Sequence, residues 1–332
     1  MSPAMPPASP TSAGSTIAAL SGDGAAVQFA SVEKRFGATA ALAGLTLEIR
    51  RGEMFGLIGP DGAGKTTAIR LLCGLLHADA GTVRVFGRDP VRDHAWVTER
   101  VGYLSQRFSL YGDLTIDENI EFFAEIHGVR DFRARRDALL EMTQLTPFRA
   151  RLADKLSGGM KQKLALACTL VHEPELIVLD EPTTGVDPVS RREFWKLLSE
   201  FLSRGLTILM STPYLDEAER CTRVALLHEG RTLAVDAPGG LRALIPGRMV
   251  EVVAPGRTDA AAIARTLPEV TDVQVFGERL HLTLGESSDE AIERVRRGIE
   301  ATSLAGASVR AVQPSLEDVF IATLSEKEQA SA

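Results

Sequence analysis

The most informative stretch of the sequence is Gly59-Pro60-Asp61-Gly62-Ala63-Gly64-Lys65-Thr66, which fits the pattern G-x-x-x-x-G-K-[ST]. The apolar run before it, Met54 to Ile58, predicts a strand, and the residues after it predict a helix over Ala68 to Leu76. In that setting the glycines let backbone N–H groups turn inward around an anion, and the helix N-terminus adds partial positive charge. We expect Lys65 to reach the terminal phosphates of a nucleotide and Thr66 to hold Mg²⁺. The stretch therefore predicts a phosphate-binding loop between a strand and a helix.

The acidic pair Asp180-Glu181 is a second candidate site, because it ends the apolar run Leu176 to Leu179. Such an unbroken run, like Leu206 to Met210 further on, is typical of a strand buried on both faces of a parallel sheet. Asp180 would hold Mg²⁺, directly or through water, and Glu181 would polarise the attacking water. Alone, such a pair is more typical of a surface loop. The phosphate-binding pattern in the same chain favours the functional interpretation.

A third stretch, Leu156-Ser157-Gly158-Gly159-Met160-Lys161-Gln162, stands just before a helical segment and ahead of the acidic pair. Ser157 and the two glycines would present hydroxyl and backbone donors to an anion at the helix start, although alone they would be an ordinary N-cap. The stretch is similar to the signature of ATP-binding cassette (ABC) proteins, which other phosphate-loop ATPases lack. That resemblance implies two cassettes packed head to tail, with each signature closing on the nucleotide held by the partner's phosphate loop.

The resemblance to ABC proteins covers about Val27 to Pro238 and implies roles for further residues. Phe36 would stack on adenine, Gln106 would contact Mg²⁺ and the attacking water, and Asp187 would lie in a loop that crosses to the partner cassette. Without the resemblance, Phe36 would be read as a core residue at a strand end and Gln106 as a solvated loop residue. Asp187 would be read as a turn residue before proline. The ATP-binding positions implied are Phe36, Gly59, Pro60, Asp61, Gly62, Ala63, Gly64, Lys65, Thr66, Thr67, Gln106, Ser157, Gly158, Gly159 and Asp187, with Glu181 catalytic and Thr66, Gln106 and Asp180 at the metal.

Pro213 departs from the family pattern. It follows the strand expected to end near Met210, where family members usually carry a histidine that contacts the γ-phosphate and the catalytic glutamate. Proline offers neither a side-chain donor nor a backbone N–H, and the nearest histidine, His228, is expected on the next strand. The sequence therefore predicts slow hydrolysis, or a partner cassette with an intact histidine. Asp61 is a smaller departure, since family members more often carry asparagine there.

The rest of the chain predicts a helical insert and a second domain. Charged and apolar residues alternate at helical spacing from Asp117 to about Thr143, within a helical subdomain over about 107–160. After Pro238 the pattern predicts the order βαββαβ, which is ferredoxin-like, with elements over 249–253, 259–267, 270–276, 279–284, 289–301 and 307–312. We expect a disordered tail over 1–26, an α/β ABC ATP-binding domain of the P-loop NTPase type over 27–238, and an α+β accessory domain over 239–325.

Composition narrows the classes of protein that fit. The 332 residues are 45% hydrophobic, which excludes a wholly disordered or collagen-like chain. A formal net charge of -7 argues against a broad basic surface for nucleic acid. No apolar run approaches the roughly 20 residues that cross a bilayer. The three cysteines form no C-x-x-C pair, so neither a disulfide framework nor a zinc site is expected, and the cytosol is the natural compartment.

Two stretches, Leu114 to Asn119 and Pro314 to Phe320, resemble the ATP-binding subunits of exporters for drugs, polysaccharides or lipids. The resemblance implies an ATPase that uses ATP and Mg²⁺ and drives integral membrane permease subunits, which would dock near Gln106 to Tyr111. The protein would then lie at the cytoplasmic face of the inner (plasma) membrane, pair with a second cassette and bind no nucleic acid. The alternatives are a non-hydrolytic ATP-sensing cassette and a soluble ABC ATPase that acts on ribosomes or DNA.

Overall fold

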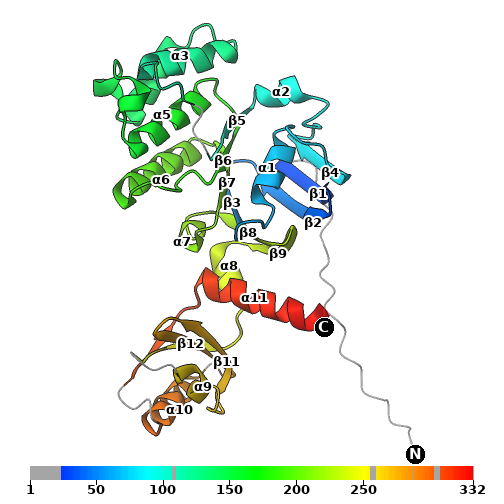
Figure 1. The fold of residues 1–332 in the computed structure, drawn as a ribbon, viewed down its shortest axis with the longest axis vertical. Helices are drawn as coiled ribbons and strands as arrows, with labels where there is room; N and C mark the ends of the chain where they lie inside the picture. Colours follow the sequence, from blue (N-terminus) through cyan, green and yellow to red (C-terminus); the bar gives the residue numbers. More distant parts are fainter. Residues whose placement is uncertain (1–23, 107–109, 255–258, 287, 303–306, 332) are drawn as a thin grey trace, which may run out of the picture.

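The computed structural model describes residues 24–106, 110–254, 259–286, 288–302 and 307–331 (Figure 1). The tail expected over 1–26 therefore falls largely on residues outside this part of the chain. The expected boundary is slightly late, because strand β1 (Ala25–Phe36) already includes residues 25 and 26. In the described ranges, no helix has the length and apolar character of a membrane span.

A six-stranded sheet forms the centre of the larger unit, in the order β5-β6-β7-β3-β8-β9. Its first five strands run parallel, and β9 pairs antiparallel with β8 at the edge. Every residue of β3, β6 and β7 is buried, which confirms the burial predicted from the unbroken apolar runs of β6 and β7 and the strand predicted at β3. The strands are β3 (Met54–Ile58), β5 (Val101–Leu104), β6 (Leu176–Asp180), β7 (Thr207–Thr212), β8 (Arg223–His228) and β9 (Arg231–Asp236).

An antiparallel sheet in the order β2-β1-β4 packs beside the first, with helix α1 (Lys65–Leu72) joining both sheets in one core. Its other strands are β2 (Thr39–Arg50) and β4 (Ala80–Val85), and the short helix α2 (His94–Thr98) precedes β5. The sequence predicted this helix over Ala68 to Leu76, but α1 both starts and ends earlier, at Lys65 and Leu72. It begins directly after Gly64, and Gly74, with φ of 69°, turns the backbone into a conformation that ends a helix.

The expected helical insert is present and projects to one side of the central sheet (Figure 1). Thr115 caps its first helix with a capping box that includes Glu118, which explains why α3 starts where it does. The insert contains α3 (Ile116–Ile126), α4 (Arg133–Met142), two short 3-10 helices (Thr146–Phe148 and Ala153–Lys155) and α5 (Gly158–Leu170). Helix α6 (Pro188–Ser203) packs against α5.

After α7 (Leu215–Ala218) and α8 (Pro238–Arg242), a smaller antiparallel sheet follows in the order β11-β12-β10-β13. Its elements follow one another in the order expected from the sequence. Helix α9 is shorter than expected, because it ends at Ala264 rather than at residue 267. Side chains of α9 and α10 cover one face of this sheet in a separate core. The elements are β10 (Arg248–Val253), α9 (Ala260–Ala264), β11 (Val270–Phe276), β12 (Arg279–Leu284), α10 (Asp289–Glu300) and β13 (Ser308–Val312).

The C-terminal helix α11 (Leu316–Ser331) returns to the larger unit (Figure 1). Leu316 and Val319 belong to the same buried core as Leu226 of β8 and Leu241 of α8. The sequence assigned this segment to the accessory domain over 239–325. Its apolar residues also pack on the larger unit, where α11 contacts α8 and β9.

Candidate functional site

The loop between β3 and α1 provides the cradle that the sequence predicted. Gly64 has φ of 100°, and a Cβ there would lie 2.5 Å from the Ala41 carbonyl oxygen. A Cβ on Gly59 would lie 2.3 Å from the Leu227 carbonyl oxygen. Glycine is therefore required at both positions by close backbone neighbours.

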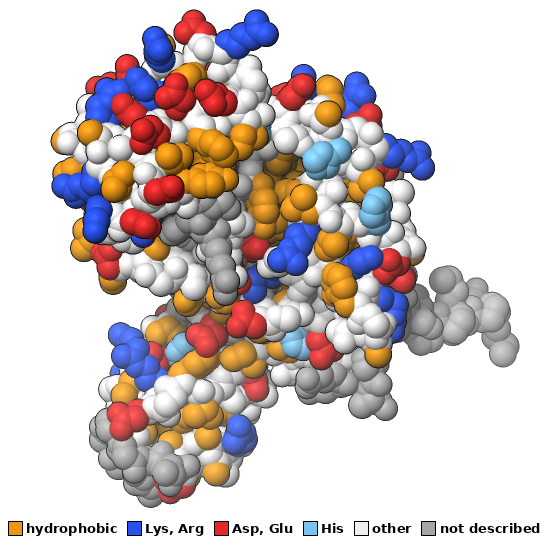
Figure 2. Space-filling view, turned by 45° about the horizontal axis from the view of Figure 1, so that its top comes forward, with side chains coloured by type: hydrophobic (Ala, Val, Ile, Leu, Met, Phe, Trp, Pro, Cys, Tyr) orange, Lys and Arg blue, Asp and Glu red, His pale blue; other side chains and the backbone are white. Residues whose placement is uncertain are grey.

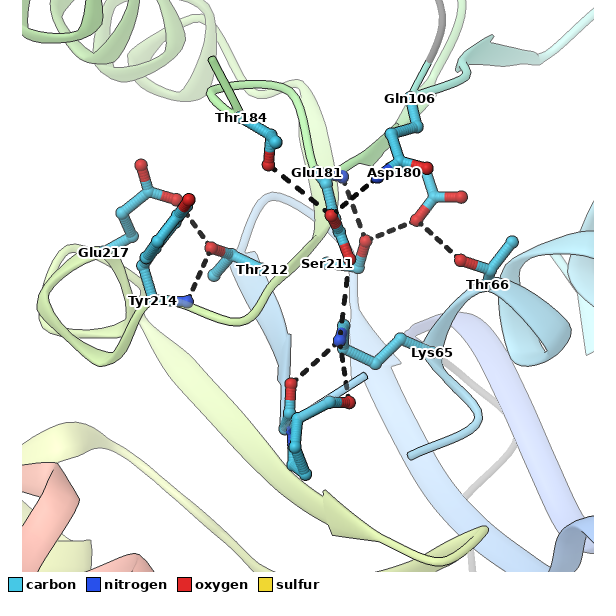
Figure 3. Close-up of polar contacts among 12 residues, drawn as sticks. Lys65, Thr66, Gln106, Asp180, Glu181, Thr184, Ser211, Thr212, Tyr214 and Glu217 are labelled. Atoms are coloured by element: carbon cyan, nitrogen blue, oxygen red, sulfur yellow. Dashed lines mark hydrogen bonds and ion pairs between the residues drawn. The ribbon is translucent and has the colours of Figure 1, made fainter. Parts of the chain in front are cut away.

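Lys65 points into this loop (Figure 3). Its buried ammonium donates to the carbonyl oxygens of Gly59, at 2.8 Å, and Pro60, at 3.1 Å. It also lies 3.6 Å from Oε1 of Glu181. A compact cation in this position is suited to the terminal phosphates of a nucleotide. Asp61, Ala63 and Thr67 complete the loop and the first turn of α1, with Asp61 exposed and Ala63 buried.

The acidic pair at the end of β6 faces α1 across the site (Figure 3). The buried Asp180 accepts hydrogen bonds at Oδ1 from Thr66 Oγ1, at 3.2 Å, and from Ser211 Oγ, at 2.6 Å. Glu181 accepts from Gln106 Nε2 at 2.9 Å. Five residues expected at the site thus meet there: Lys65, Thr66, Gln106, Asp180 and Glu181.

Glu181 has φ of 48°, a conformation that non-glycine residues adopt rarely and that persists when the surroundings hold it. Its backbone N–H donates to the carbonyl oxygen and to Oγ of Ser211, each at 3.1 Å. Sequence reasoning missed Ser211. The signal was a polar residue at the end of an apolar strand, and the parallel register places it directly beside Asp180.

The donor set around Asp180 fits Mg²⁺. Hydroxyl, carboxylate and amide oxygens are hard ligands, and Mg²⁺ is usually bound by one or two carboxylates together with substrate phosphates. Across the described residues, no group of three or more His, Cys, Asp or Glu side chains could hold a metal by itself. Thr66 and Asp180, with Gln106 beside them, are therefore suited to an ion that arrives with a phosphate ligand.

The signature turn and Asp187 lie at neighbouring helix starts. Ser157 caps α5 by accepting from Met160 N, and Asp187 caps α6 by accepting from Val189 N and Ser190 N. A Cβ on Gly159 would lie 2.2 Å from Ser190 Oγ, so the two helix starts are in close contact. Hydrogen bonds from the cap lower the pKa of Asp187. The hydrogen bonds of Ser157 and Asp187 thus join them to their own helices, and Gly158 lies exposed beside them.

Phe36 ends β1 with 49% of its surface exposed, and Lys34 Nζ lies 5.7 Å from its ring centroid. The structure therefore excludes the alternative that Phe36 is a core residue. An exposed ring is available for stacking on a base.

The last residue of β7 and the segment after it, which contains Pro213, form a side-chain network that the sequence did not predict. Thr212 Oγ1 accepts from Tyr214 N at 3.0 Å and donates to Oε2 of Glu217 at 2.8 Å (Figure 3). His228 ends β8, as expected, and its ring packs against Phe320 of α11 rather than against Glu181.

Comparisons with known proteins agree with this geometry. Residues 42–184 match the family described as ABC transporter. The chain is 42% identical over 297 residues to the probable multidrug ABC transporter ATP-binding protein YbhF of Escherichia coli (strain K12), covering 87% of this chain and 50% of that protein. It thus spans about half the length of that relative. It is 36% identical over 306 residues to the daunorubicin resistance ATP-binding protein DrrA2 of Streptomyces coeruleorubidus, and the match covers 90% of this chain and 95% of that protein. It is 40% identical over 262 residues to the Nod factor export ATP-binding protein I of Paraburkholderia xenovorans (strain LB400), and the match covers 77% of this chain and 85% of that protein.

Solved structures give the same result. The ATP-binding subunit of an ABC transporter superposes with a TM-score of 0.60 at 29% identity, covering 66% of this chain and 92% of that one. A bacterial ABC transporter cassette described as dimeric superposes with a TM-score of 0.57 at 25% identity, covering 64% and 98%. These likenesses and the site geometry lead to one conclusion. The chain belongs to the ABC transporter family, among its ATP-binding proteins.

Proposed function

We propose that the chain is the ATP-binding and ATP-hydrolysing subunit of a membrane exporter, and that MgATP drives its head-to-tail dimerisation. One observation carries this proposal. The phosphate loop and the acidic pair line one site, whereas no hydrogen bond or ion pair among the described residues joins Ser157, Gly158 or Gly159 to that site. Ser157 caps its own helix, so this turn is available to the nucleotide of a second chain. The likeness to a cassette described as dimeric supports this arrangement.

Each residue of the site has a role in hydrolysis. The amides of the phosphate loop and Lys65 bind the phosphates, and Phe36 stacks on the adenine. Thr66 and Asp180 hold Mg²⁺, which when bound offsets the charge on the phosphates. Glu181 accepts a proton from the attacking water, and Gln106, which now donates to Glu181, helps to place that water. Ser157, Gly158, Gly159 and Asp187 act on the partner's nucleotide.

Integral membrane permease subunits are the partners that we propose for the helical insert. Figure 2 shows hydrophobic side chains gathered on the insert, where Tyr111, Ile126 and Leu152 are 45%, 62% and 40% exposed. Apolar surface of this kind is typical of an interaction site. Relatives named for multidrug transport, daunorubicin resistance and Nod factor export favour an exporter of drug-like or lipid-like molecules. The protein would then lie peripherally at the cytoplasmic face of the inner membrane.

We further propose that Pro213 slows hydrolysis, because the position has neither an imidazole nor a backbone donor for the γ-phosphate. A partner cassette with the histidine would restore the rate. The relatives are named as transport, resistance or export proteins. Those names give no support to an ATP sensor or to a ribosome-acting or DNA-acting ATPase.

Substitution Glu181→Gln tests the proposed dimer, because the water loses its base while the phosphate contacts remain. With MgATP, light scattering after gel filtration is expected to show a dimer of this variant and a monomer without nucleotide. Adding Lys65→Ala to the same variant should abolish the dimer by removing the phosphate contact. A Glu181→Gln protein that binds ATP but stays monomeric contradicts the proposal.

A further inference from the structure

Glu217 is a buried carboxylate that contacts two loops of the site without facing the phosphate loop. It lies in α7 and is only 1% exposed. Its Oε1 accepts from Thr183 Oγ1 at 2.5 Å, and its Oε2 accepts from Thr212 Oγ1 at 2.8 Å. Arg191 Nε of α6 lies 3.7 Å from Oε1. Burying a charge is costly unless it is paired and hydrogen-bonded, and Glu217 meets that condition through these three groups.

The chemistry of a carboxylate orients both hydroxyls. An ionised carboxylate only accepts, so Thr183 and Thr212 must each use their single hydroxyl proton on Glu217. Thr212 then has a lone pair free for Tyr214 N, which fixes the turn that contains Pro213. Each hydroxyl is thus held in one orientation, and two loops that are about 30 residues apart in sequence are fixed to one side chain.

Both loops carry the groups that hold the catalytic carboxylates. Thr212 follows Ser211, whose hydroxyl bonds to Asp180 and to the Glu181 backbone. Thr183 stands two residues after Glu181, in the loop that leads to Asp187, and its carbonyl oxygen accepts from Val186 N. Glu181 has a rare backbone conformation that its neighbours must maintain.

We propose that Glu217 is a positioning residue that holds the loop 181–187 against the segment 211–214. Through this contact Glu181 keeps its orientation toward the nucleotide and Asp187 keeps its place toward the partner cassette. At position 213 the proline supplies no donor, so the side chains of Thr212 and Glu217 supply the connection. The inference rests on the proposed ATPase function. It predicts an effect on turnover rather than on nucleotide binding, because the hydrogen bonds and the ion pair of the Glu217 side chain join it to Thr183, Thr212 and Arg191, which lie outside 59–66.

The test compares Thr183→Val, which keeps the side-chain shape but loses the hydroxyl, with Thr183→Ser, which keeps the hydroxyl. In steady-state ATPase assays, Thr183→Val is expected to lower kcat about tenfold, the effect of losing one hydrogen bond to a charged group. Its affinity for a fluorescent ATP analogue should stay within about twofold of the unsubstituted protein. Thr183→Ser should retain turnover. Thr143→Val is the matched control, since it removes an equally buried hydroxyl that bonds only to Leu139 O and Leu140 O.

Amide hydrogen exchange provides a readout that does not depend on hydrolysis. Thr183→Val is expected to speed exchange at Thr184 and Val186, whose amides bond within the loop, while Thr143→Val leaves them unchanged. Equal loss of turnover in Thr183→Val and Thr183→Ser, or unchanged exchange in Thr183→Val, overturns the proposal. Absence of ATP hydrolysis in the unsubstituted protein would instead count against the proposed function, and the exchange result would still decide the role of Glu217.

Discussion

At the scale of single residues, the phosphate loop depends on glycines for two different reasons. Gly62 and Gly64 both have positive φ, at 81° and 100°, but only Gly64 has backbone and side-chain atoms where a Cβ would lie. Gly62 needs glycine for its conformation alone. Gly64 needs it also because the Ala41 carbonyl oxygen would lie 2.5 Å from a Cβ.

Substitution Gly64→Ala is therefore expected to lower the free energy of unfolding by about 2–4 kcal/mol, from backbone strain together with overpacking. Gly62→Ala, which also has a positive φ but open space around it, should cost about 1 kcal/mol. Urea unfolding of the two variants measures the difference. Equal costs would show that the contact with β2 does not restrict this position.

Pro213 permits a second prediction at this scale. In Pro213→His, an imidazole becomes available to the γ-phosphate and to Glu181, and positioned donors contribute about 10²–10³-fold to such transition states. We expect kcat of the homodimer to rise at least about tenfold in a steady-state ATPase assay. Pro213→Ala is the control, since it removes the ring and restores the backbone N–H but adds no imidazole, and it should leave kcat well below that of Pro213→His. Similar rates for all three proteins would contradict the role given to Pro213.

At the scale of elements, the start of α3 organises the segment that leads into the insert. The buried Asn119 donates to the carbonyl oxygens of Tyr111, Leu114 and Thr115 and accepts from Tyr111 N. Its two amide protons are shared among these three carbonyl oxygens, and its Oδ1 is the acceptor for Tyr111 N. The exposed ring of Tyr111 is thus presented by a backbone that is held from within.

Substitution Asn119→Ala should lower the free energy of unfolding by about 1–3 kcal/mol, because Tyr111 N loses its acceptor and three carbonyl oxygens lose one of their donors. Asn119→Asp keeps the acceptor for Tyr111 N but loses the donors. The backbone amide of Tyr111 should therefore exchange more slowly in Asn119→Asp than in Asn119→Ala. Thermal unfolding and amide exchange at Tyr111 measure the two effects. If both variants exchange equally fast, the Oδ1 contact is not what holds the segment.

The stacked rings of His127 and His172 join the end of α3 to the residues after α5, with centroids 3.8 Å apart. Burial, with a smaller contribution from His127, lowers the pKa of His172 from 6.5 to about 4. Between those values the unfolded chain binds a proton that the folded chain does not, so stability present above pH 6.5 is lost as the pH falls toward 4. His172→Phe keeps a stacking ring without titrating, and its melting temperature should fall less over this range. If the melting temperatures of the unsubstituted protein and His172→Phe fall equally between pH 6.5 and 4, His172 is not the source of this pH dependence.

The elements also show what the sequence could predict. Strands β3, β6 and β7 and the phosphate loop follow from local patterns, since apolar runs and glycines reveal burial and turns without knowledge of the partner. Ser211 and Glu217 could not be predicted in the same way. Their partners, Asp180 and Thr183, lie about 30 residues away, and the contacts depend on the register of β6 against β7. The end of α1 was misplaced because Gly74 takes a positive φ, which a single glycine in a helical pattern does not reveal.

At the scale of the whole molecule, the phosphate loop is connected to the C-terminal helix through the turn between β8 and β9. Gly230 N in that turn donates to Ala63 O, and Gly230 O accepts from Ala43 N of β2. Helix α11 packs on β9 beyond this turn. The same helix bonds to the smaller sheet, because Asp318 accepts from His281 of β12 at 2.6 Å. One helix thus contacts both the larger unit and the accessory sheet.

Asp318 is the residue on which this connection depends most. It is fully buried, and besides His281 its carboxylate accepts from the backbone N–H and the hydroxyl of Ser315 at the start of α11. Asp318→Ala should therefore remove the carboxylate half of the cap and release β12 together, lowering the free energy of unfolding by about 3 kcal/mol or more, although Ser315 Oγ still accepts from the N–H of residue 318. The neighbouring Glu317 is exposed, so Glu317→Ala should cost less than about 0.5 kcal/mol. Urea unfolding measures both, and limited proteolysis should cut Asp318→Ala faster between residues 312 and 316. Equal stability and equal cleavage of the two variants would show that α11 is held by its apolar face alone.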